Sequence, residues 1–139
     1  MIAVGDSLPP FEIHLTLQRL VMEAAANRDF MPIHHDRDFA RASGAPDAYA
    51  NTFFLQSLCE ITLRRWMGPA GRLKKLEINM LQFNCVGDRL ACCGTVRSVR
   101  IEAALTRAEL ALWVESQRGH TVSASATVEL HTLPIVPGT

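Results

Sequence analysis

The sequence lacks a long hydrophobic run, an excess of charge of either sign and a leader-like start. No stretch approaches the roughly 20 apolar residues that span a bilayer, so we expect no membrane span. Lys+Arg and Asp+Glu both number 14, giving a formal net charge of zero, and no basic run offers a nucleic-acid surface. The first residues show no charged leader followed by an apolar segment, so we predict no signal peptide and a cytoplasmic location.

Metal, nucleotide and serine-nucleophile chemistry also have little support. The four cysteines, at positions 59, 85, 92 and 93, do not have the spacing of a disulfide framework or a zinc site. The sequence contains neither a phosphate-binding glycine-rich loop nor a Gly-x-Ser-x-Gly elbow. We therefore expect no metal and no separate cofactor.

The hydrophobic fraction of 48% in 139 residues is enough for a core and predicts one domain over residues 1–139. The pattern predicts a short strand at 11–15, a helix at 17–27, a loop at 29–34, a short helix at 36–43 and a long helix at 48–66, followed by strands. Asp36 is the expected N-cap of the short helix and Gly44 its stop. Pro46-Asp47 is expected to open the long helix and Gly68-Pro69 to end it.

Apolar residues lie on most sides of the long helix, which predicts burial nearly all around it. After Gly71 the apolar period becomes two, and it switches parity between Met80 and Leu81, which indicates a bulge or a bend before further strand at 81–85. Gly87-Asp88 is expected to form a hairpin turn into a strand at 89–100, and Arg118-Gly119 a second turn.

These elements predict an α+β fold in which a curved antiparallel sheet wraps around one long helix. That arrangement is the hot dog. On pattern alone a cystatin-like roll has similar ingredients and stays open.

Titratable residues are densest in the segment 28–40, between two predicted helices. Asp29 and His34 lie five apart across a turn that contains Pro32, and such a turn brings a carboxylate and an imidazole to one small volume. That pair is what a hydration needs, because one group takes a proton while the other gives one. An aspartate that only bonds its own turn and a histidine near a helix start are the simpler interpretation of the same spacing.

The resemblance of this segment to a known family favours the catalytic interpretation of Asp29 and His34 over the structural one. Asp29, Pro32, Ile33, His34, Asp36 and Ala40 match the signature of the MaoC-like, or (R)-specific, enoyl-CoA hydratases. Gly44 and Pro46 match the family's link into the hot-dog helix, and Gly87-Asp88 its later turn.

One branch is more closely similar, the small catalytic subunit of steroid side-chain enoyl-CoA hydratases. Its features here include the doubled His34-His35, Asn51 early in the long helix and Trp66-x-Gly68-Pro69 at its end. The sequence departs from the general signature at Arg28, where the family has glycine, and at Met31, where it has asparagine.

The resemblance implies a trans-2-enoyl-CoA substrate and an (R)-3-hydroxyacyl-CoA product, with CoA as part of the substrate. It implies that Asp29 and His34 are catalytic and that Thr52 takes the place of the glycine whose backbone N–H polarises the thioester. Tyr49, Asn51 and Phe53 are near the helix start and are expected to contribute to substrate binding.

The resemblance also implies a partner, because the CoA tunnel of hot-dog proteins forms between two of them. A homodimer and a heteromer with a second hot-dog subunit both stay open. So do two other functions: a hot-dog thioesterase, for which Glu60 is the available carboxylate on the long helix, and a non-catalytic subunit that binds acyl-CoA.

Overall fold

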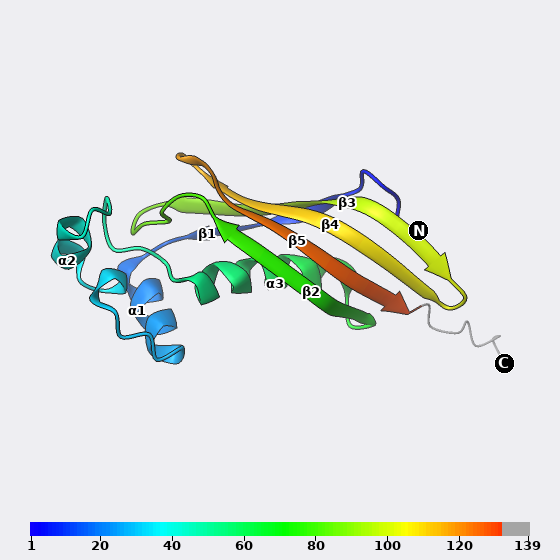
Figure 1. The fold of residues 1–139 in the computed structure, drawn as a ribbon, viewed down its shortest axis with the longest axis horizontal. Coiled ribbons are helices and arrows are strands. Elements are labelled where there is room, and N and C mark those ends of the chain that lie inside the picture. The colour runs from blue at the N-terminus through cyan, green and yellow to red at the C-terminus, as the bar shows by residue number, and fades with distance from the viewer. Residues whose placement is uncertain (132–139) are drawn as a thin grey trace.

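The computed structural model describes residues 1–131, which form one five-stranded antiparallel sheet and a set of helices that lie against one face and one end of it (Figure 1). Along the chain the elements are β1 (Ser7–His14), α1 (Leu17–Ala26), the 3₁₀ turn η1 (Pro32–His34), α2 (Arg37–Ala42), α3 (Thr52–Met67), β2 (Gly71–Met80), β3 (Arg89–Glu102), β4 (Leu105–Ser116) and β5 (Gly119–His131). Residues 132–139 lie outside the described residues, so the expectation of one domain over 1–139 stays a prediction.

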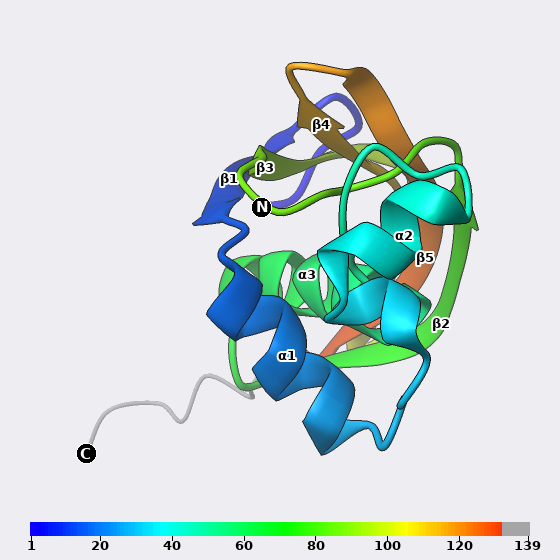
Figure 2. The same cartoon turned by 90° about the vertical axis from the view of Figure 1, so that its left-hand side faces the viewer.

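The sheet has the strand order β1-β3-β4-β5-β2 and curls around α3, while α1 and α2 lie beyond the N-terminal end of that helix (Figure 2). Leu55 and Leu63 of α3 are fully buried and share one cluster with Leu110, Leu112 and Val114 of β4. Each fully buried leucine contributes about 1.5–3 kcal/mol relative to an exposed one. The helix-to-sheet contact therefore holds the fold together, and the predicted α+β arrangement is confirmed.

Strands β4 and β5 follow the alternation that the sequence predicts. Ala108 and Leu112 of β4 are buried, Glu109 between them is exposed, and β4 pairs antiparallel with β5 along its whole length. The turn that joins the two strands uses Gly119 at φ +89, a conformation that a residue with a side chain rarely adopts. The predicted Arg118-Gly119 turn is confirmed.

The chain bends after Met80, as predicted, but residues 81–85 are not strand and Gly87-Asp88 does not close a hairpin. Strand β2 pairs with β5, so residues 81–88 cross from the edge of the sheet to β3. The backbone N–H groups of Leu81 and Gln82 both donate to the Thr121 carbonyl, which ends the regular ladder. The alternation in 81–85 was misleading because part of this loop packs against the segment that precedes α3.

The long helix begins at Thr52, four residues later than predicted, with Asn51 as its N-cap. Residues 48–50 are not helical: Tyr49 forms an isolated bridge with Cys85, and the Ala50 N–H donates to the Asn84 carbonyl at 2.9 Å. This pairing with the 81–88 loop outweighs the helix signal of Pro46-Asp47.

The predicted burial of α3 on nearly all sides is also wrong for the isolated chain. Phe53 is 57% exposed and Ile61 37%, so one stripe of the helix faces outward. The predicted caps of the shorter helix are confirmed: the Asp36 side chain accepts a hydrogen bond from Phe39 N–H, and Gly44 has a φ of +100.

Candidate active site

The segment after α1 reverses direction so that Asp29 and His34 face each other. Helix α1 ends at Ala26, Arg28 takes a left-handed conformation with φ +55, and the Asp29 N–H donates to the Ala24 carbonyl at 2.8 Å. Pro32, with its fixed φ and no N–H, then starts the 3₁₀ turn that carries His34. The local sequence therefore produces the turn that the Asp-x4-His spacing required.

The two side chains are in direct contact. Asp29 Oδ2 lies 3.1 Å from His34 Nε2, with the His34 side chain 7% exposed and the Asp29 side chain 27% exposed. His34 Nδ1 lies 2.7 Å from the Tyr49 carbonyl oxygen, and the Tyr49 N–H donates back to the Ile33 carbonyl. The ring is held on both sides, which fixes its orientation.

These contacts determine where the protons lie. A carbonyl oxygen only accepts hydrogen bonds, so His34 Nδ1 carries a proton and Nε2 faces the carboxylate. A neutral Nε2 and a carboxylate oxygen are both acceptors, so their contact requires one proton between them. The pair thus holds one proton jointly, as a group that both takes and gives protons must.

Asn51 joins this pair from the start of α3. Its Nδ2 donates to Asp29 Oδ2 at 3.3 Å, and its Oδ1 accepts from the Phe54 N–H at 2.8 Å. Among the predicted site residues, Asn51 is therefore the only one besides His34 whose side chain bonds Asp29 in the described part of the chain.

A hollow of about 250 Å³ opens beside the pair. All six predicted site residues line it: Asp29, His34, Tyr49, Asn51, Thr52 and Phe53. The lining also includes three residues that were not predicted to belong to the site, Ile33, Ala50 and Met80. Met80 reaches the hollow because β2 ends beside the start of α3, and the Thr52 hydroxyl contacts its sulfur at 3.3 Å. Sequence periodicity places Met80 on a strand but gives no sign of which helix end that strand meets.

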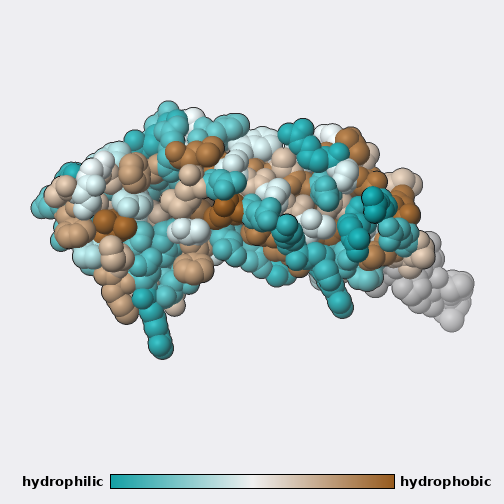
Figure 3. Space-filling model, viewed as in Figure 1, coloured by the Kyte–Doolittle hydropathy of each residue, from teal (hydrophilic) through white to brown (hydrophobic). Residues whose placement is uncertain are grey.

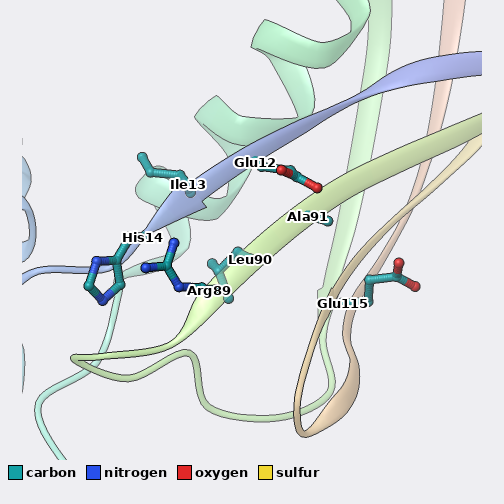
Figure 4. A pocket seen from close by; sticks show the side chains of 7 residues that line it. All are labelled: Glu12, Ile13, His14, Arg89, Leu90, Ala91 and Glu115. Carbon is teal, nitrogen blue, oxygen red and sulfur yellow. The ribbon is translucent and has the colours of Figure 1, made fainter.

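A larger hollow of about 410 Å³ lies elsewhere, across β1, β3 and β4, and shares no lining residue with the first (Figure 4). Arg89 and His14 lie side by side at one end of it and Glu115 at the other (Figure 4). It holds no pair of groups in contact like Asp29 and His34, so we place the candidate active site at the smaller hollow. No group of three or more metal-binding side chains occurs within residues 1–131.

Asp47 holds helix α2 against the segment that leads into the site. Its carboxylate accepts hydrogen bonds from Arg37 Nε and Nη2 at 2.9 and 2.8 Å and from Arg41 Nη2 at 3.3 Å, which ties α2 to the segment carrying Tyr49. The hydrogen bonds from Arg37 lower the pKa of Asp47 to about 2, and the Ala48 N–H and the positive charge of Arg41 add to this against the opposing effect of burial.

Comparison with known proteins shows which fold the chain has and which proteins it is similar to. No family model matches the sequence. Among curated proteins, the chain is 32% identical over 80 residues to the 3-oxo-4,17-pregnadiene-20-carboxyl-CoA hydratase beta subunit of Mycobacterium tuberculosis (strain ATCC 25618 / H37Rv). That match covers 58% of this chain and 62% of the relative, less than two thirds of its length.

Solved structures match over nearly the whole chain. A chain of the ChsH1-ChsH2 complex from Mycobacterium tuberculosis superposes with a TM-score of 0.86 at 25% identity, covering 94% of this chain and 100% of that one. The (R)-hydratase from A. caviae involved in PHA biosynthesis gives 0.84 at 22% identity, over 93% of this chain and 97% of that one. The MaoC-like dehydratase from Rhodospirillum rubrum gives 0.83 at 19% identity, over 96% of each chain.

This chain has the MaoC-like hot-dog fold. The resemblance that the segment 28–40 indicated is confirmed, and the cystatin-like roll is excluded. In this fold the Asp29–His34 pair lies at the N-terminal end of the central helix, where the Asn51 side chain bonds Asp29. None of the helices in residues 1–131 has the length and hydrophobicity that a membrane crossing needs.

Proposed function

We propose that this chain is an enoyl-CoA hydratase that adds water to a trans-2-enoyl-CoA. The observation that carries the proposal is the contact of Asp29 with His34 in a hollow at the start of α3, on a MaoC-like hot-dog fold. Each group alone has a structural explanation. Their joint proton and their access to the hollow favour proton transfer.

In the proposed reaction, a water molecule binds between the pair and the β-carbon of the substrate. Asp29 takes a proton from the water as its oxygen bonds to C3, and His34 Nε2 gives a proton to C2. The π electrons of the C2=C3 bond form the new C2–H bond. The pair ends with the same number of protons that it began with, because Asp29 gains the one that His34 loses. Positioned acid–base groups of this kind contribute about 10²–10⁴-fold in rate.

The start of α3 is suited to polarising the thioester carbonyl during this addition. Asn51 Oδ1 occupies the Phe54 N–H, while the N–H groups of Thr52 and Phe53 donate to no other group of the described residues. These two donors and the positive end of the helix dipole favour the negative charge that develops on the carbonyl oxygen. Replacing the family's glycine by Thr52 leaves the backbone donor in place.

The acyl group is proposed from the curated relative. That protein is named for a pregnadiene-carboxyl-CoA, so a steroid side-chain thioester is the first substrate to test. The signature residues at 29–40 support an (R)-3-hydroxyacyl-CoA product. Tyr49 and Phe53, which line the hollow, are proposed contacts for the acyl chain.

We also propose that a second hot-dog subunit completes the site. Strand β2 is a ten-residue edge strand, whereas the opposite edge, β1, contains Pro9 and Pro10 and an irregular register. Proline lacks the N–H that strand pairing needs, so β2 is the edge that can accept another chain.

Exposed apolar side chains lie near that edge. Met80, Leu81 and Phe83 are 41%, 56% and 38% exposed, and Met80 also lines the hollow. On the face of the molecule that Figure 3 shows, hydrophobic residues form several separate patches among polar ones. This pattern fits a partner that is held by edge-strand hydrogen bonds together with small apolar contacts. The name of the ChsH1-ChsH2 complex favours a heteromer over a homodimer.

The thioesterase alternative has less support. Glu60 forms an ion pair with Arg64 one turn along α3, at 2.7 Å, and it does not line the hollow that holds Asp29. Release of free CoA thiol on mixing with an acyl-CoA would favour this alternative, since hydration releases none.

The proposal is tested by following the loss of the conjugated enoyl-thioester absorbance. The chain is assayed alone and co-expressed with a second hot-dog subunit, on short-chain and steroid side-chain enoyl-CoAs. Hydration in either form supports the proposal, and the form that is active distinguishes a homo-oligomer from a heteromer. Absence of hydration on every substrate in both forms would refute it.

A further inference from the structure

Asn51 connects the N-terminus of α3 to the candidate catalytic carboxylate. It is 6% exposed, its Oδ1 accepts from the Phe54 N–H, and its Nδ2 donates to Asp29 Oδ2. Both ends of the amide are thus engaged by groups of the protein. This is a different use from the substrate contact that the sequence predicted for Asn51.

The cap determines which way the amide points. The oxygen and nitrogen of an asparagine are nearly equivalent in shape, and hydrogen-bond partners decide between them. The Phe54 N–H is a donor, so the Asn51 atom that faces it must be the oxygen. Nδ2 is therefore directed at Asp29, and a residue with only a cap function would have no need of this second atom.

We propose that Asn51 is a positioning residue that fixes the rotation of the Asp29 carboxylate, an inference that rests on the proposed function. His34 Nε2 and Asn51 Nδ2 both meet the same oxygen, Oδ2, at 3.1 and 3.3 Å. The other oxygen, Oδ1, receives only the Met31 N–H at 3.4 Å. With Oδ2 held from two sides, Oδ1 is the oxygen that keeps the capacity to take a proton from water.

No other side-chain amide bonds Asp29 within residues 1–131. Met31, which stands where the family signature has asparagine, brings only its backbone N–H. The orientation of Asp29 thus depends on a residue 22 positions away along the chain, on a different element. A change at the start of α3 reaches the carboxylate through one hydrogen bond.

Two variants separate the positioning role from the capping role. Asn51→Ser keeps an oxygen that can cap α3 but removes the donor to Asp29. We expect kcat to fall by about 10–100-fold with KM within about twofold, because the reacting carboxylate loses its fixed geometry. Asn51→Asp also keeps the cap but puts a second carboxylate beside Asp29, so the acid limb of the pH–rate profile should move to higher pH.

Asn27→Ser is the matched control. It makes the same substitution at an exposed asparagine near Asp29 whose amide contacts Glu23 instead. We expect wild-type kinetics from this control. An Asn51→Ser variant that keeps kcat within about twofold of the wild type, in an active wild-type background, would overturn the inference and leave the proposed function intact.

A measurement that needs no substrate tests the role of Asn51 even if the wild type shows no hydration and the proposed function fails. The His34 ring is followed by NMR during a pH titration of the wild type and of Asn51→Asp. The added negative charge should move the midpoint of the ring titration to higher pH, because it favours the imidazolium. An unchanged midpoint would show that position 51 does not act on the pair.

Discussion

The ion-pair cluster around Asp47 gives a stability prediction whose size can be worked out. Asp47→Asn keeps the shape of the side chain and removes its charge. The pKa of Asp47 is lowered from 3.8 to about 2 in the folded protein, mainly by the hydrogen bonds from Arg37. At about 1.36 kcal/mol per unit, this corresponds to at most about 2.4 kcal/mol of stability.

That figure is reduced by solvent screening. The Asp47 side chain is 14% exposed, but those of Arg37 and Arg41 are 46% and 49% exposed. Pairs with exposed arginines contribute less than their shifts suggest, so we expect Asp47→Asn to cost about 1–1.5 kcal/mol at pH 7. For a protein of this size that lowers Tm by about 3–5 °C.

The pH dependence gives the sharper test. A carboxyl whose pKa is lowered by folding adds stability above its unfolded pKa, and this stability is lost as the pH falls through the folded value. The difference between wild type and variant should therefore be complete at pH 7, shrink by about half near pH 3, and vanish below pH 2. Urea unfolding at pH 7 and pH 3 measures it. Equal differences at the two pH values, or none at pH 7, would refute the reasoning.

Two further predictions concern the core and a thiol. Leu55→Ala removes a fully buried side chain of α3. It should lower the free energy of unfolding, measured by urea denaturation, by about 2–5 kcal/mol. A loss below about 1 kcal/mol would mean that α3 does not anchor the core. Burial and, to a smaller extent, the charge of Glu115 raise the pKa of Cys93 to about 11. Alkylation of Cys93 at pH 8, measured by mass spectrometry, should therefore be at least about a hundredfold slower than that of free cysteine. Labelling at the rate of free cysteine would contradict this environment for Cys93.

The sequence predicts the parts of the fold that depend on local periodicity and caps. The alternation of β4 and β5, the Asp36 cap and the glycine turns at 44 and 119 all follow from neighbours within a few residues. The Asp-x4-His turn is local as well: Pro32 and the left-handed Arg28 produce it.

Long-range pairing is what the sequence leaves undetermined. Alternation in residues 81–85 predicts a strand, but alternation alone does not say which strand is the neighbour, and β2 pairs with β5 instead of β3. The predicted start of α3 is wrong for the same reason, because Tyr49 pairs with Cys85, which is far away along the chain. Asn51 could have been recognised as an N-cap by its residue type, whereas its contact with Asp29 depends on how α1 and α3 meet.

The most direct test of the catalytic pair compares it with its own neighbours. Asp29→Asn and His34→Ala are measured for enoyl-CoA hydration beside Asp38→Asn and His35→Ala, which alter exposed residues of the same types a few positions away. With unchanged circular dichroism, the first two should lose at least about a hundredfold in kcat/KM, and the second two should stay within about twofold of the wild type. Near-wild-type hydration by both Asp29→Asn and His34→Ala would contradict the assignment of this pair as the group that activates water.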